Sequence, residues 1–134
     1  MTVIETKKEV SSNSPQKLFD FLTDMNNFEA LMPEGKVEKW NSEKDQCEFT
    51  IKGMARIGLK IVDTESPNRI QIESFGKVPF PFTLEICLDE KDNEGSEVYM
   101  TFKGEINAFM KMMVEKPLRN FFNMLVEKAA TLSL

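Results

Sequence analysis

The sequence contains no histidine, and this absence narrows the chemistry that the protein can perform. Without imidazole, the usual Ser-His and Cys-His nucleophile pairs are excluded, and a zinc site lacks its commonest nitrogen ligand. The six glycines are scattered and form no glycine-rich phosphate loop. We therefore expect neither a metal nor a cofactor, and the sequence argues against hydrolytic and nucleotide-dependent reactions.

Cysteine is also scarce. Cys47 and Cys87 are the two cysteines, and they form no Cys-x-x-Cys motif. This usage argues against the disulfide framework of a small secreted protein. We expect two separate buried thiols. We also expect Cys47 to be unreactive, because nothing in its strand supplies a base that would activate the thiol.

Long hydrophobic runs are absent as well. No apolar stretch approaches the ~18 residues of a membrane span, and the polar first residues do not resemble a signal peptide. The chain has 17 Lys and Arg against 22 Asp and Glu, a net charge of −5, whose field repels polyphosphates and anionic lipid surfaces. We expect a cytoplasmic protein with no nucleic-acid partner and no stable membrane insertion.

The remaining composition is that of a folded domain. A chain of 134 residues with 41% hydrophobic and 29% charged residues can bury one core, and we expect a single domain spanning residues 1–134. A charged, strand-compatible segment at 3–10 is followed by Ser14 and Pro15, which are typical of a helix start. A second short helix is expected at 28–32, before Pro33 and Gly35.

From residue 37 to residue 106 the hydrophobic pattern has a period of two. Cys47, Phe49 and Ile51, for example, alternate with polar neighbours. Short turn-rich segments separate the apolar stretches, so the pattern predicts an antiparallel meander with one buried, apolar face.

The C-terminal segment returns to helical periodicity. Apolar residues form one stripe from Leu118 to Leu132, which predicts a helix lying across the sheet. Asn107 is a suitable N-cap for an earlier start, but Pro117 is expected to kink or interrupt such a helix.

The order of these elements resembles the helix-grip fold of the START-like superfamily, also called SRPBCC or the polyketide cyclase and lipid-transfer superfamily. The segment 14–24, with its Ser-Pro cap and aromatic-rich helix, and the segment 28–33, ending in proline, are similar to that family's opening. The resemblance implies an α+β fold in which an antiparallel sheet of six to seven strands curves around a long C-terminal helix. Two short helices would lie between the first and second strands.

The resemblance also implies a cavity between the concave sheet and the C-terminal helix, where members of the superfamily hold sterols, lipids, quinones, hormones or polyketides. Eleven Phe and nine Met against one Trp and one Tyr fit a weakly specific apolar cavity. The residues expected to line or rim it are apolar: Phe49, Ile61, Ile72, Phe80, Phe82, Met100, Phe102, Phe109, Met113, Phe121 and Leu125. The same side chains are equally suited to fill the core and leave a small cavity or none.

Two segments allow more than one interpretation. Phe80 stands between Pro79 and Pro81, where it either rims the cavity entrance or anchors the loop to the core. The Met-rich segment 109–113 either packs locally, gates the cavity, or contacts a second subunit or a membrane.

Three functions follow, in order of preference. The first is non-enzymatic binding or carriage of a hydrophobic small molecule, such as a lipid, a quinone or a polyketide-like compound. The second is a protein-interaction domain with a largely filled cavity, acting as a homodimer or with a partner through the Met-rich segment. The third is a cyclase-like enzyme, but no catalytic residues are predicted, because the carboxylates occupy the polar strand face.

Overall fold

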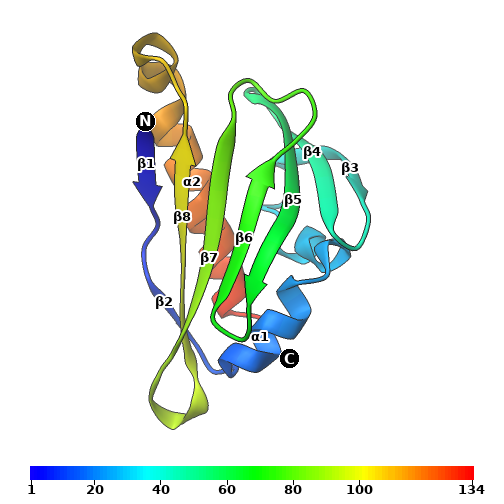
Figure 1. Cartoon of the computed structure of the whole chain (residues 1–134), viewed down its shortest axis with the longest axis vertical. Helices are drawn as coiled ribbons and strands as arrows, with labels where there is room; N and C mark the ends of the chain where they lie inside the picture. The colour runs from blue at the N-terminus through cyan, green and yellow to red at the C-terminus, as the bar shows by residue number, and fades with distance from the viewer.

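An antiparallel sheet curves around one long helix in the computed structural model, which describes residues 1–134 (Figure 1). The strands are β1 (Thr2–Glu5), β2 (Glu9–Ser11), β3 (Val37–Ser42), β4 (Gln46–Ile51), β5 (Ala55–Glu65), β6 (Arg69–Ser74), β7 (Phe82–Glu90) and β8 (Ser96–Gly104). The helices are α1 (Pro15–Leu22), η1 (Met25–Leu31), η2 (Asp92–Glu94) and α2 (Ala108–Ala130). The predicted α+β class and antiparallel meander are confirmed.

Seven strands follow one another in the order β1-β8-β7-β6-β5-β4-β3, and β2 pairs with β8 beyond the end of β1. The segment expected as one strand at 3–10 is therefore two short strands on the same neighbour. Between them, the Thr6 amide donates to the Met100 carbonyl oxygen at 3.0 Å, and the Met100 amide donates to Thr6 Oγ1 at 2.9 Å. The threonine hydroxyl thus takes over one ladder bond where the strand is interrupted.

The two short helices begin at capping side chains. Ser14 Oγ accepts a hydrogen bond from the Lys17 amide at 3.3 Å, and Pro15 is the first residue of α1, as predicted. The second helix starts earlier than the expected 28–32, because the Asp24 carboxylate accepts from the Asn26 amide at 3.0 Å. It is a 3-10 helix, the tighter form common in short connecting pieces.

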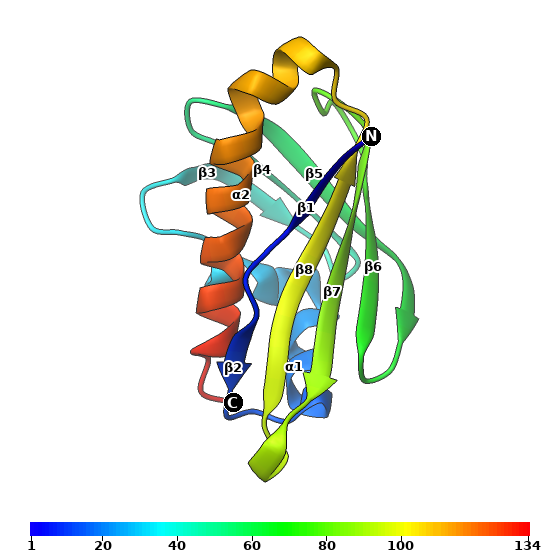
Figure 2. The same cartoon turned by 90° about the vertical axis from the view of Figure 1, so that its left-hand side faces the viewer.

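Helix α2 takes the earlier of the two starts considered from the sequence. Asn107 Oδ1 accepts a hydrogen bond from the Met110 amide at 2.8 Å. The helix is not interrupted at Pro117, although proline supplies no N–H to the preceding turn. Figure 2 shows its first turns bending away from the axis of the remainder, which crosses the concave face of the sheet.

Aromatic rings fill the space between α2 and the middle of the sheet. Phe102 of β8 lies 5.4 Å from Phe122 of α2 and 5.2 Å from Phe82 of β7, measured between ring centroids. Phe49 of β4 lies 5.9 Å from Phe121 of α2. These contacts pin the C-terminal two thirds of the helix to the sheet and leave its first turns without such partners.

Candidate ligand-binding pocket

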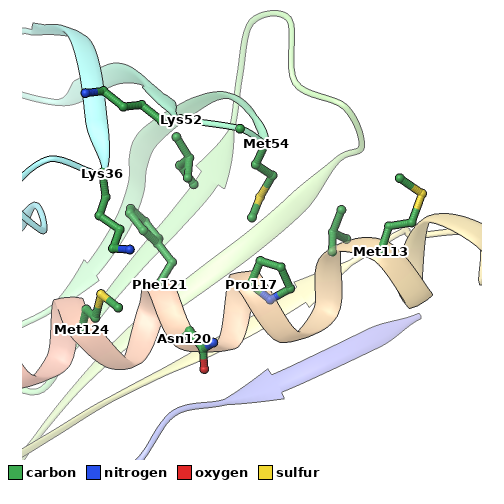
Figure 3. A pocket seen from close by; sticks show the side chains of 11 residues that line it. Lys36, Lys52, Met54, Met113, Pro117, Asn120, Phe121 and Met124 are labelled. Carbon is green, nitrogen blue, oxygen red and sulfur yellow. The ribbon is translucent and has the colours of Figure 1, made fainter.

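A pocket of about 420 Å³ lies between the middle of α2, the start of β3 and the turn that joins β4 to β5 (Figure 3). Its lining is formed by Lys36, Ile51, Lys52, Gly53, Met54, Met113, Val114, Pro117, Asn120, Phe121 and Met124. The volume falls in the range of ~300–1,000 Å³ found for small-molecule sites.

Two glycine turns build the sheet side of the pocket. The Met54 amide donates to the Ile51 carbonyl oxygen at 3.0 Å, and Gly53 within that turn has a φ of +77°, which a side chain would strain. The Lys52 amide donates to the Lys36 carbonyl oxygen at 3.0 Å. This bond holds Lys36, next to a second turn, beside the β4–β5 turn.

The helix side is one face of α2. Met113, Pro117, Phe121 and Met124 are three or four residues apart and therefore lie above one another along the helix. Phe121 is buried by its stacking on Phe49, so it closes the inner end of the pocket. Toward the helix start, Pro117 and Met113 are exposed to solvent and Val114 is half-buried.

The lining is mainly apolar and deformable. Met54, Met113 and Met124 supply three thioethers, which adapt to irregular ligand shapes. No carboxylate takes part in the lining. Figure 3 shows the Lys36 side chain directed toward Phe121 and α2, whereas the Lys52 side chain runs away from the helix and the Asn120 amide lies on its other side.

Residues 8–132 match the sequence model of the CoxG family, which is described as a subunit of carbon monoxide dehydrogenase. The chain belongs to the CoxG family. No curated protein matches the sequence of this CoxG-family chain.

Solved structures share the fold of this CoxG-family protein at low sequence identity. TTHA0849 from Thermus thermophilus has a TM-score of 0.76 and 13% identity, with 96% of this chain and 94% of that chain covered. CV1439 from Chromobacterium violaceum has a TM-score of 0.74 and 13% identity, with 98% and 97% covered. A point mutant of norcoclaurine synthase from Thalictrum, in complex with a transition-state analogue, has a TM-score of 0.70 and 9% identity, with 96% and 93% covered. These structures confirm the helix-grip fold, and the match to the CoxG family confirms the START-like, SRPBCC-type superfamily.

Of the eleven residues predicted to line or rim a cavity, Met113 and Phe121 line the pocket of the CoxG-family chain. Phe109 is 74% exposed on the first turn of α2. Ile61 is half-buried against the core. The others belong to the buried core and do not line the pocket: Phe49, Ile72, Phe80, Phe82, Met100, Phe102 and Leu125.

Phe80 follows the core-anchor interpretation in this structure. It is buried, and its ring meets Phe102 edge-on at 6.2 Å and lies 6.2 Å from Phe82. The flanking Pro79 and Pro81 restrict the backbone on either side of this ring, and Phe80 does not line the pocket.

The sequence prediction found Met113 but missed both lysines and the other two methionines of the pocket: Lys36, Lys52, Met54 and Met124. Lys36 and Met54 adjoin glycine turns at the same end of the sheet, where loops commonly carry binding residues. Gly35-Lys36 and Lys52-Gly53 were therefore an available signal. Met124 had none, because it falls beside the apolar stripe of the helix.

Reactive groups are few around the pocket. Cys47 is buried in β4, and burial, reinforced by Glu48, raises the pKa of its thiol to about 12. No group of three or more Asp, Glu or Cys side chains is arranged to hold a metal ion. No helix combines the length and the hydrophobicity needed to cross a membrane.

Proposed function

We propose that this CoxG-family protein binds a hydrophobic small molecule, such as a lipid, a quinone or a polyketide-like compound, in the α2 pocket without converting it. The observation that carries the proposal is the pocket itself, whose apolar lining includes Ile51, Met54, Val114 and Phe121. Burial of apolar ligand surface there contributes about 25 cal/mol per Å² before the costs of association are subtracted. Such a site binds apolar compounds with moderate affinity and little discrimination.

The pocket opens onto an apolar surface that suits ligand entry. Phe109, Met112 and Met113, called here the α2 patch, are 74%, 88% and 63% exposed. Met113 also lines the pocket, so the patch and the pocket are continuous. A hydrophobic molecule that contacts the α2 patch can therefore reach the pocket along a continuous apolar surface.

The proposal is tested with the uncharged apolar dye Nile red, whose fluorescence rises in a dry site. Met54→Glu places a carboxylate in the pocket wall and is expected to weaken dye binding about tenfold or more, because an ionised group opposes apolar burial. Val62→Glu adds the same charge at an exposed position of β5, outside both the lining and the α2 patch, and is the matched control. Equal binding by the wild type and Met54→Glu would exclude this pocket as the site.

Native and denaturing mass spectra of the purified protein identify a retained ligand. An adduct is expected that is present in the native spectrum, absent after denaturation, and lost in Met54→Glu but not in Val62→Glu. An adduct that persists in Met54→Glu would assign the ligand to another part of the molecule.

A second candidate, a protein-interaction domain, is favoured by the exposure of the α2 patch and by the family description, which names a component of carbon monoxide dehydrogenase. Light scattering after size exclusion tests self-association through the patch. A dimer that becomes monomeric in Met112→Lys supports this function, and a wild-type monomer at every concentration contradicts the homodimer.

A cyclase-like role has less support, because the pocket lining offers no carboxylate or tyrosine as an acid or base.

A further inference from the structure

The pocket is polar at one end and apolar at the other. At the inner end, the Lys36 ammonium group lies near Phe121, and at the outer end Met113 leads to the α2 patch (Figure 3). Met54 and Pro117 face each other between these two ends. A molecule that lies along the pocket therefore meets a cation with one end and only apolar side chains along its length.

The Lys36 ammonium group has no protein partner. The five ion pairs of the structure engage Lys7, Lys91, Lys111, Arg56 and Arg69, and Lys36 takes part in none of them. Its donors are therefore available to a ligand. A neutral apolar ligand that covered this group would remove water from it without replacing the lost hydrogen bonds, which costs free energy.

The charge of the lining contrasts with the charge of the whole protein. The chain carries a net charge of −5, yet the lining contains Lys36 and Lys52 and no acidic residue. Over distances shorter than the Debye length of ~8–10 Å, these two nearby cations act more strongly than the dispersed negative charges. The pocket is locally suited to a negative group in spite of the overall charge.

We propose that the ligand of the α2 pocket is an amphiphile with one apolar chain and an anionic head group, a carboxylate or a phosphate, which Lys36 binds. The proposal rests on the proposed function of the same pocket and specifies its ligand class. The chain lies between Met54 and Pro117 and points toward the α2 patch. Lys52 is near enough in the lining to strengthen the local positive charge, but its side chain does not point at the head group.

Three twelve-carbon probes with different heads test this assignment by isothermal titration: dodecanoate, dodecanol and dodecyltrimethylammonium. The two charged probes are kept below their micelle concentrations, and dodecanol is kept below its solubility limit. Dodecanoate is expected to bind about fivefold more tightly than dodecanol at low salt, since Lys36 is exposed to solvent and such pairs are weak. Dodecyltrimethylammonium is expected to bind less tightly than dodecanol. Added salt should reduce the differences among the three.

Lys36→Met is the decisive variant. It is expected to lower dodecanoate affinity to the level of dodecanol and to leave dodecanol affinity unchanged. Lys17→Met, on an exposed turn of α1 away from the pocket, makes the same change in net charge and should alter neither affinity. Lys52→Met should lower dodecanoate affinity by less than Lys36→Met. Circular dichroism checks that each variant is folded.

The outcomes separate the two proposals. If dodecanol binds at the pocket but dodecanoate binds no better, or if Lys36→Met weakens both equally, the head-group assignment is wrong and apolar binding stands. If none of the probes binds the wild type, both proposals fail. Acetate is expected not to compete with dodecanoate, and competition by acetate would show a plain anion site in place of an amphiphile site.

Discussion

The ring of Phe49 on β4 stacks on the ring of Phe121 on α2, with centroids 5.9 Å apart and planes inclined by 29°. Trp40 of β3 stacks on the other side of Phe49 at 5.7 Å. This three-ring column ties the outer strands of the sheet to the helix. Phe121, the helix member of this column, also lines the pocket, so its contact with Phe49 serves both stability and the shape of the site.

Truncation of this column is expected to be costly. Phe121→Ala removes a buried ring and should lower the free energy of unfolding by about 3–5 kcal/mol, measured by urea denaturation. A double-mutant cycle with Phe49→Ala isolates the pair, for which a coupling of about 0.5–1.5 kcal/mol is expected. Strict additivity of the two single losses would show that the rings do not interact.

Phe80→Ser tests whether the loop between two prolines anchors the core. Because Phe80 is 5% exposed and packs on Phe82 and Phe102, we expect a loss of about 3 kcal/mol or more in unfolding free energy. Nile red affinity of the folded protein should be unchanged, since Phe80 does not line the pocket. Phe109→Ser, at an exposed position, serves as the control and should stay within about 0.5 kcal/mol of the wild type. A stable Phe80→Ser variant with weakened dye binding would restore the entrance role.

The two cysteines are expected to be unreactive in the folded protein. Burial raises the pKa of both Cys47 and Cys87 to about 12, with smaller contributions from Glu48 and Glu85 respectively. At neutral pH both thiols stay protonated, so iodoacetamide should label them only after denaturation, as mass spectrometry can follow. Rapid labelling of the native protein at neutral pH would contradict the burial of these side chains.

The same shift predicts a pH dependence of stability. A thiol has a pKa of ~8.5 in the unfolded chain, so above that value the unfolded state loses protons that the folded state keeps. The free energy of unfolding should therefore fall as the pH rises from about 8.5 toward 12. The Cys47→Ala, Cys87→Ala double variant should show a shallower fall, and an identical slope would assign the effect to other groups.

The single tyrosine reports on a polar cluster of the outer sheet face. Arg69 Nη1 lies 2.8 Å from Asp89 Oδ1, and the Tyr99 hydroxyl donates to Asp89 Oδ2 at 3.1 Å. Partial burial raises the pKa of Tyr99 to about 12, helped by Cys87 and by the bond to the Asp89 carboxylate. For Asp89 itself, partial burial raises the pKa, but the hydrogen bonds from Arg69 and Tyr99 together lower it.

Asp89→Asn should lower the pKa of Tyr99, because the variant removes the negative charge that opposes ionisation of the phenol. Tyrosinate absorbance follows this one residue without interference from another tyrosine. Glu97→Gln, on the same face of β8 but bonded to Lys91 at 3.3 Å, is the control and should leave the titration unchanged. A midpoint that does not move in Asp89→Asn would show that burial alone sets it.

Much of the fold could be predicted because its signals are local. Ser14 and Asn107 cap the helices at the positions that the sequence indicates, and the alternation around Phe49 assigns the buried face of β4. The sequence left open whether α2 continues across Pro117, since a proline removes one hydrogen bond but neighbouring turns still hold the helix. The split of the first strand depended on Thr6 and its partner Met100, which are distant in sequence.

The sequence by itself determined the order of strands and helices, the buried faces of the central strands and the lack of imidazole chemistry, because each follows from residue type and short-range periodicity. Only the tertiary structure decided where the pocket lies. Alternation shows that Phe82 and Phe102 face inward, but it does not show whether helix rings fill the space above them or leave it open. The pocket joins Lys36, Met54 and Met113, which come from three separate segments, so its existence and its charge depend on how closely α2 packs at each end of the sheet.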